Sequence, residues 1–167
     1  MTKQSESLAA VLGRIAGAAR VAGRDPMSVR LVAVSKQQPV EAIRSVAQAG
    51  QRDFGESYTQ EALPKIESLA DLKLTWHFIG RLQGNKTRAV AERFDWVHTV
   101  DRDRIADRLN EQRPASLPPL NVCIQVQVTP EPQKAGTPPD EVEALARHIL
   151  GLPRLKLRGL MCIPPAG

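Results

Sequence analysis

The sequence predicts an α/β fold, a (β/α) TIM-type barrel with an extra helix at its N-terminus. Short apolar segments alternate with segments of helical periodicity along the chain. Strand followed by helix throughout requires parallel strands joined by helical crossovers. This alternation is compatible with a doubly wound sheet as well as a barrel. The helix before the first strand and the short, irregular strands favour the barrel.

Six segments have the composition of buried parallel strands. They are short and rich in β-branched and apolar residues; the first, for example, reads RLVAVS. The longest follows a loop punctuated by prolines. In chain order, the expected strands are residues 30–35, 52–55, 74–79, 95–100, 121–128 and 157–163.

The segments before and between these strands carry helical signals. The first repeats apolar side chains on one helical face, which predicts an amphipathic helix. Gly50 is a good C-terminal stop, Pro64 is an interior residue that can bend its helix, and Asp101 is a plausible N-cap. In chain order, the expected helices are residues 6–21, 39–50, 58–69, 84–93, 101–109 and 139–149.

Length and composition are those of an ordinary globular chain. The 167 residues match one domain, so we expect residues 1–167 to form a single unit. No apolar run approaches the roughly 18–20 residues of a bilayer span, and the N-terminus is a poor signal peptide because Arg14 interrupts its apolar stretch. Cys123 and Cys162 are too few for a disulfide framework and lack metal-ligand spacing. These features favour a cytoplasmic protein with no membrane partner.

The net charge of +5 raises the possibility of nucleic-acid binding. The basic residues are spread thinly, however, and usually stand beside an acid. The sequence has no basic run of five and only six aromatic residues, so neither a phosphate-tracking stripe nor a base-stacking platform is visible. We therefore expect no nucleic-acid partner.

Lys36 is the strongest candidate for chemistry. Sites in parallel α/β folds lie at the carboxyl ends of the strands, and Lys36 follows the first expected strand. A lysine in partly apolar surroundings more readily presents a free amine, which can form a Schiff base with an aldehyde. The alternative is a solvated lysine without a chemical role.

Six strings carry a resemblance to a known family. They are LVAVSK at residues 31–36, FGESYTQE at 54–61, WHFIGRLQGNK at 76–86, HTVD at 98–101, QKAG at 133–136 and LRGLM at 157–161. In this order they closely resemble the pyridoxal phosphate homeostasis protein family. The most specific of them is HFIG-x-LQ-x-NK.

The resemblance implies a barrel like the N-terminal domain of alanine racemase, with pyridoxal 5′-phosphate at the carboxyl ends of the strands. Lys36 matches the family's Schiff-base lysine. The cofactor-binding residues that it implies are Lys36, Ser57, Tyr58, His77, Lys134 and Met161.

Several of these residues have a structural alternative. His77 lies mid-strand, where a packed, hydrogen-bonded barrel histidine is the stronger interpretation. Tyr58 could instead cap its loop, and Met161 could belong to the core. Glu56 could position the cofactor ring, although binding of loop backbone donors is slightly favoured.

The resemblance implies a non-enzymatic role in vitamin B6 homeostasis. Such a protein would hold the cofactor on Lys36, buffer its free concentration and pass it to acceptor enzymes. The alternative is a racemase-like enzyme that uses the same cofactor. It is disfavoured because the sequence has no second domain to supply an opposing acid or base. We expect a monomer.

The sequence departs from the family pattern at three places. Ser57 stands where the family has asparagine, and Gln38 stands where many relatives carry a second lysine. The family also continues for about another quarter of its length, with strings that cup the cofactor phosphate. The sequence thus accounts for about six of the eight strand–helix units of a barrel. We expect an incomplete barrel, from a truncated reading frame or a fragment.

Overall fold

Six parallel strands form one sheet in the computed structural model, which describes residues 3–129 and 135–164. Each strand pairs with the next one along the chain, in the order β1-β2-β3-β4-β5-β6. The strands are β1 (Ala33–Val34), β2 (Asp53–Glu56), β3 (Thr75–Phe78), β4 (Trp96–Val100), β5 (Leu120–Gln125) and β6 (Leu155–Met161).

Six α-helices precede and connect these strands. They are α1 (Lys3–Val21), α2 (Val40–Gln48), α3 (Thr59–Ser68), α4 (Thr87–Arg93), α5 (Asp103–Gln112) and α6 (Val142–Leu150). Single 3₁₀ turns lead into α4 and α6, at Gly84–Lys86 and Pro139–Glu141. No helix among the described residues is long and apolar enough to cross a membrane.

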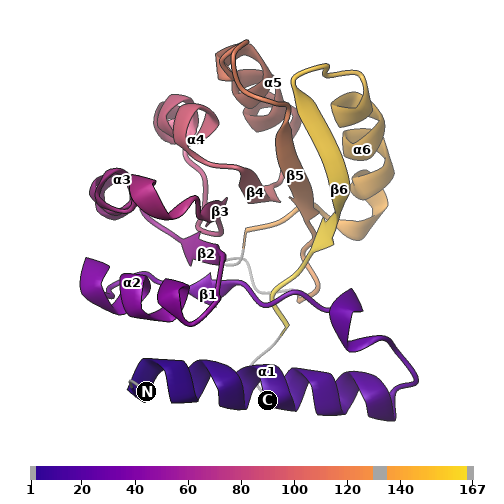
Figure 1. Ribbon diagram of the computed structural model, residues 1–167. Helices are drawn as coiled ribbons and strands as arrows, with labels where there is room; N and C mark the ends of the chain where they lie inside the picture. Colours follow the sequence, from indigo (N-terminus) through magenta and orange to yellow (C-terminus); the bar gives the residue numbers. More distant parts are fainter. Residues whose placement is uncertain (1–2, 130–134, 165–167) are drawn as a thin grey trace.

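The strand order confirms the barrel-type fold. A doubly wound sheet reverses its strand order at one point, which places helices on both faces. Here the order never reverses, and Figure 1 shows α2 to α6 arranged around the outer face of a curved sheet. Among the described residues β1 and β6 pair only with β2 and β5, so the sheet is open.

One apolar core fills the space between the sheet and the outer helices. The outward side chains of β2 and β3, Phe54, Trp76 and Phe78, are buried there. Phe78 meets Phe94 edge-on with ring centroids 5.4 Å apart. The next residues along these strands, Gly55 and His77, alternate to the inner face, where His77 contacts Asp53 and His98.

The largest difference from the expected elements is at the first strand. The expected strand covers six residues, whereas β1 has only two. β1 has a partner on one side only, and Gln37 adopts a left-handed conformation with φ of 61° shortly after it, which ends the extended run.

The prediction of Asp101 as an N-cap is wrong. The N-cap of α5 is Arg102, whose backbone is extended and whose side chain makes no capping hydrogen bond. The Asp101 carboxylate accepts a hydrogen bond from Arg102 Nη1 at 2.6 Å, so it is committed to that ion pair.

Candidate functional site

Lys36 lies at the carboxyl-terminal rim of the sheet, two residues after β1, and it is exposed. Ser35 still donates its N–H to Gly55 O at 2.9 Å, so the pairing with β2 continues to that residue. Lys36 and Ser57 are the first residues after this paired segment on the two neighbouring strands. Both therefore lie at the same rim, at the mouth of the open barrel.

A buried ionic cluster lies on the other face of the sheet, directly under Lys36. Ser35 Oγ donates to Glu56 Oε1 at 2.6 Å, and Lys65 Nζ, from α3, donates to the same oxygen at 2.9 Å. Glu56 is completely buried and Lys65 almost so. Glu61 closes the cluster through Lys65 Nζ at 2.5 Å. Glu56 therefore has a structural role, but its donors are side chains of neighbouring elements and not the loop backbone donors that were expected.

Ser57 and Tyr58 line a cavity of about 380 Å³ at the ends of β2 and β3. Arg81 and Lys86 add two basic side chains to its wall. Gly80 approaches the backbone of Ser57 so closely that a Cβ on it would lie 2.1 Å from Ser57 O. This contact fixes the two loops that follow β2 and β3 against each other.

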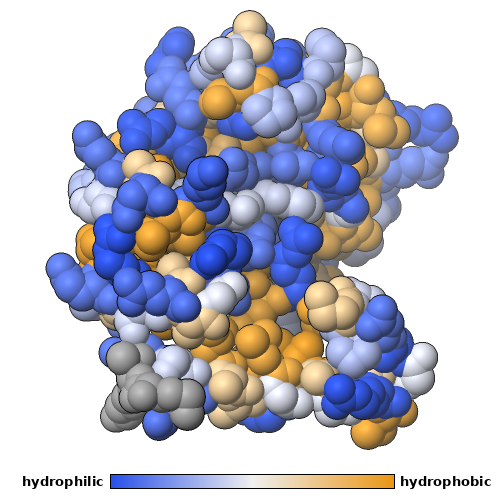
Figure 2. All heavy atoms as spheres, in the orientation of Figure 1, coloured by the Kyte–Doolittle hydropathy of each residue, from blue (hydrophilic) through white to orange (hydrophobic). Residues whose placement is uncertain are grey.

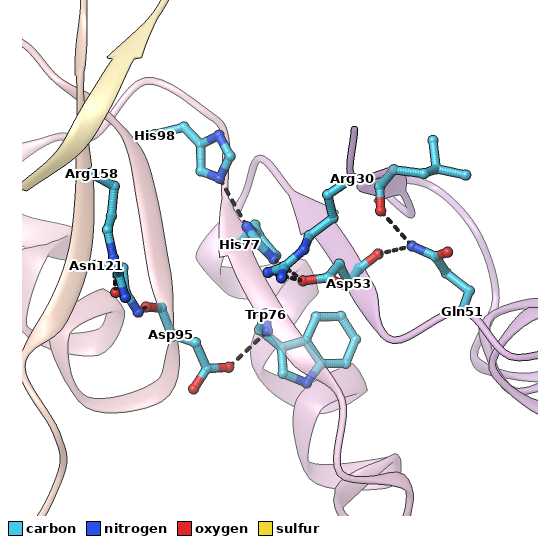
Figure 3. A network of polar contacts seen from close by, with 10 residues as sticks. Arg30, Gln51, Asp53, Trp76, His77, Asp95, His98, Asn121 and Arg158 are labelled. Atoms are coloured by element: carbon cyan, nitrogen blue, oxygen red, sulfur yellow. Dashed lines mark hydrogen bonds and ion pairs between the residues drawn. The ribbon is translucent and has the colours of Figure 1, made fainter. Parts of the chain in front are cut away.

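His77 occupies the middle of β3 on the inner face and is almost fully buried. Its Nε2 lies 2.9 Å from Asp53 Oδ1 and its Nδ1 lies 2.9 Å from His98 Nε2, as Figure 3 shows. Trp96 stacks on the ring with centroids 5.5 Å apart. The structure thus gives His77 the packed, hydrogen-bonded environment favoured by the sequence. A contact of His77 with a cofactor stays a prediction.

Burial lowers the pKa of both histidines. Desolvation lowers the pKa of His77 in spite of the nearby Asp53 carboxylate. For His98, desolvation and the neighbouring His77 together lower the pKa to about 4. Both rings are therefore neutral near pH 7. In the hydrogen bond between them, an N–H of one ring donates to the unprotonated nitrogen of the other.

The remaining candidate residues lie elsewhere. Met161 ends β6, is half-buried and pairs in register with Gln125, so it comes from the opposite end of the strand order to Lys36. Lys134 lies outside the described residues. The part of the chain that the structure describes contains no group of three metal-ligating side chains, and its two cysteines are free.

Sequence reasoning singled out neither Lys65 nor Glu61. The signal was present, because these residues are four apart on an expected helix and their side chains therefore share one face. That this face turns toward Lys36 depends on how α3 packs against β2, which the spacing does not contain. The pairing of His77 with Asp53 and His98 was missed for the same reason.

The alanine racemase N-terminal domain model matches residues 7–166. Among curated proteins, the pyridoxal phosphate homeostasis protein of Pseudomonas aeruginosa is 58% identical over 98% of this chain and 71% of its own length. The protein of that name from Escherichia coli K12 is 52% identical over the same shares. The chain thus spans about seven tenths of the curated relatives that it matches.

Solved structures give the same result. PipY of Synechococcus elongatus with pyridoxal phosphate bound superposes with a TM-score of 0.83 and 39% identity, over 99% of this chain and 72% of PipY. Alanine racemase of Enterococcus faecalis has a TM-score of 0.66 at 16% identity, over 92% of this chain and 41% of the racemase. At that identity the racemase similarity concerns the fold alone.

Proposed function

This chain belongs to the alanine racemase N-terminal-domain family and, within it, to the pyridoxal phosphate homeostasis proteins; on that premise we propose that it binds pyridoxal 5′-phosphate and serves vitamin B6 homeostasis. We assign the binding unit to residues 1–167 as a single domain. The observation that carries the proposal is the exposure of Lys36 at the carboxyl-terminal rim of the sheet, in a chain that superposes on a relative solved with this cofactor.

The side chains at the rim suit the cofactor. Lys36 offers a primary amine to the aldehyde. Ser57 and Tyr58 offer hydroxyl groups to polar atoms of the ring, and the Met161 thioether can pack against the ring face. Arg81 and Lys86 add positive charge in the adjoining cavity, where a phosphate group would be attracted.

The proposed binding is covalent and reversible. The neutral amine of Lys36 adds to the aldehyde carbon, and one water molecule leaves as the carbon–nitrogen double bond forms. Addition of water reverses the reaction and returns the free aldehyde. A protein that does only this would buffer the cofactor and release it to acceptor enzymes without catalysing a reaction of its own.

Reductive labelling tests this function. The protein is mixed with pyridoxal phosphate and reduced with borohydride, and the modified lysines are mapped by mass spectrometry. We expect the adduct on Lys36, and we expect Lys36→Ala to lose it while an exposed-lysine control, Lys156→Met, keeps it. Labelling spread over other lysines with Lys36 unmodified would refute the assignment.

The same preparation separates the binding function from a racemase-like one. Pyridoxal without its phosphate should label Lys36 more weakly, because the basic cavity then has no anion to attract. The loaded protein should not interconvert the enantiomers of alanine. Racemisation that depends on Lys36 would favour an enzyme.

A further inference from the structure

The backbone around Lys36 is held from beneath by a cluster of polar and charged side chains from β2, α3 and the residue that follows β1. This cluster consists of Ser35, Glu56, Glu61 and Lys65, and we refer to it as the clamp. Its members lie on the outer face of the sheet and are mostly buried, whereas Lys36 is exposed at the rim. The clamp therefore hydrogen-bonds the main chain of the residues before and after Lys36, Ser35 and Gln37. The side chain of Lys36 is not part of the clamp.

Lys65 is the centre of the clamp. Its Nζ donates to Ser35 O at 2.8 Å, to Glu56 Oε1 at 2.9 Å and to Glu61 Oε1 at 2.5 Å. An ammonium group has three donors, and all three are used here. The amine of Lys65 is thus committed to hydrogen bonding between two carboxylates, although it lies close to Lys36 along the fold.

Glu61 holds the other side of Lys36. The N–H of Gln37 donates to Glu61 Oε1, the same oxygen that binds Lys65. Gln37 has a φ of 61°, a left-handed conformation that is energetically costly for a residue other than glycine. The hydrogen bond to Glu61 offsets part of this cost and fixes the turn. Both contacts lower the pKa of Glu61, the Lys65 hydrogen bond most.

Ser35, the residue that follows β1, completes the clamp. Its hydroxyl donates to Glu56 Oε1 at 2.6 Å, and its carbonyl accepts from Lys65. Glu56 Oε2 is buried and has no hydrogen-bond partner among the described residues. Among the described residues, the hydrogen bonds of the Glu56 carboxylate therefore all go to Oε1, the oxygen that binds Ser35 and Lys65.

We propose that Lys65, Glu56 and Glu61 are positioning residues for Lys36: they fix the peptide units on both sides of it, so that its amine is presented at the rim. This inference rests on the proposed function of Lys36. It also assigns different roles to the two nearby lysines. Lys36 is the nucleophile, whereas all three donors of the Lys65 ammonium group are used in hydrogen bonds.

The first test compares Glu61→Ala with Glu61→Gln. Glutamine keeps an acceptor oxygen for Gln37 and Lys65, whereas alanine removes it. We expect Glu61→Ala to raise the dissociation constant for pyridoxal phosphate, measured by absorbance titration, by roughly tenfold, as for the loss of one hydrogen bond to a charged group. Glu61→Gln should restore most of this affinity.

Glu67→Ala is the matched control. Glu67 lies on the same helix, is exposed, and should leave the dissociation constant unchanged. The second readout is the share of borohydride-trapped adduct found on Lys36 relative to other lysines. A loss of stability alone would lower the melting temperature of the unliganded protein without changing this share or giving rescue by glutamine.

The second test addresses Lys65. Lys65→Met alone leaves the buried Glu56 carboxylate without its cation and can prevent folding. The double variant Lys65→Met/Glu56→Gln removes both charges at once. We expect the double variant to fold, to bind at least tenfold more weakly, and to lose selectivity for Lys36.

The outcomes separate this inference from the proposed function. If the wild-type protein forms no adduct on Lys36, the proposed function fails and the clamp has nothing to position. If the wild type labels Lys36 and the folded clamp variants label it with unchanged affinity and selectivity, the function stands and the positioning role is refuted. Failure of glutamine to rescue a folded Glu61→Ala phenotype also contradicts it.

Discussion

The inner face of β2, β3 and β4 carries a short chain of polar residues, Asp53, His77 and His98. His77 bridges the other two with both ring nitrogens. Arg30 approaches the Asp53 carboxylate to 3.7 Å, and Arg158 lies over the Trp96 ring at 5.6 Å. Because desolvation outweighs the attraction of Asp53, the pair of rings is held neutral in the folded state.

This neutrality makes stability depend on pH with a defined sign. The unfolded chain binds protons at these histidines near pH 6.5, whereas folded His98 binds its proton only near pH 4. The stability that the neutral histidines contribute is therefore fully present above about pH 7 and is lost as the pH drops toward 4. The shift of His98 alone corresponds to about 2 kcal/mol lost between about pH 7.5 and 5.

His98→Asn should flatten this dependence. The measurement is the free energy of unfolding from urea titrations at several pH values above 5, where most carboxylates are ionised in both states. His148→Asn is the opposite control, because Asp107 raises the pKa of His148, which therefore stabilises the fold on the acid side. An unchanged slope in His98→Asn would contradict the assignment.

At the scale of elements, the contact between the loops after β2 and β3 depends on Gly80. Gly80→Ala would place a methyl group against the Ser57 carbonyl, with main-chain atoms that cannot rotate away. We expect a loss of roughly 1–3 kcal/mol and weaker cofactor binding, since Ser57 and Tyr58 must shift. Thermal melting measures the loss of stability, and absorbance titration with pyridoxal phosphate measures the loss of affinity.

Gly84→Ala is the matched control for this variant. A Cβ there would meet only Arg108 Nε, at 3.9 Å, which is ordinary van der Waals contact. It should therefore retain both stability and binding. If Gly80→Ala behaves like Gly84→Ala, the two loops are not locked together as described.

The sequence predicts the six strands and six α-helices found among the described residues, because the strands are short apolar segments and the helices carry helical signals. Their ends are less well predicted where tertiary contacts decide them. β1 is shortened by its single partner, and Asp101 is drawn into an ion pair instead of capping α5. The segments expected as helices from residues 84 and 139 each begin with a 3₁₀ turn. No sequence pattern distinguishes these turns from the α-helix that follows.

The site divides in the same way. Lys36 is predictable from its position at a strand end and from the resemblance, because a rim residue of a parallel sheet is set by the order of elements. Lys65 and Glu61 are not, since their helix shows only that they share a face. Which neighbours that face meets depends on the packing of α3 against the sheet.

At the scale of the whole molecule, the open sheet leaves apolar surface uncovered. Figure 2 shows an apolar area over the space between α1 and β1, where Leu8, Val11, Leu31 and Val32 help to line a cavity of about 550 Å³. At the other end of the sheet, Leu160 of β6 is 64% exposed. Unpaired strand edges next to apolar side chains favour self-association.

Leu160→Lys tests this expectation. A charge on the outer strand should oppose edge-to-edge contact, so sedimentation should show less association at high protein concentration than in the wild type. Leu150→Lys is the control, because Leu150 is 73% exposed but ends α6, away from the sheet edge. Equal effects of the two substitutions would exclude the strand edge as the contact surface.

The sequential strand order also affects how the chain can fold during its synthesis. Every strand pairs only with its neighbours along the chain, and α4 packs between α3 and α5 in the same order. Such local connectivity keeps the entropy cost of each new pairing small. The sheet can therefore grow by one strand and helix at a time during synthesis on the ribosome. The Lys36 rim and the α3 side chains beneath it lie in the part of the chain that is synthesised before β4.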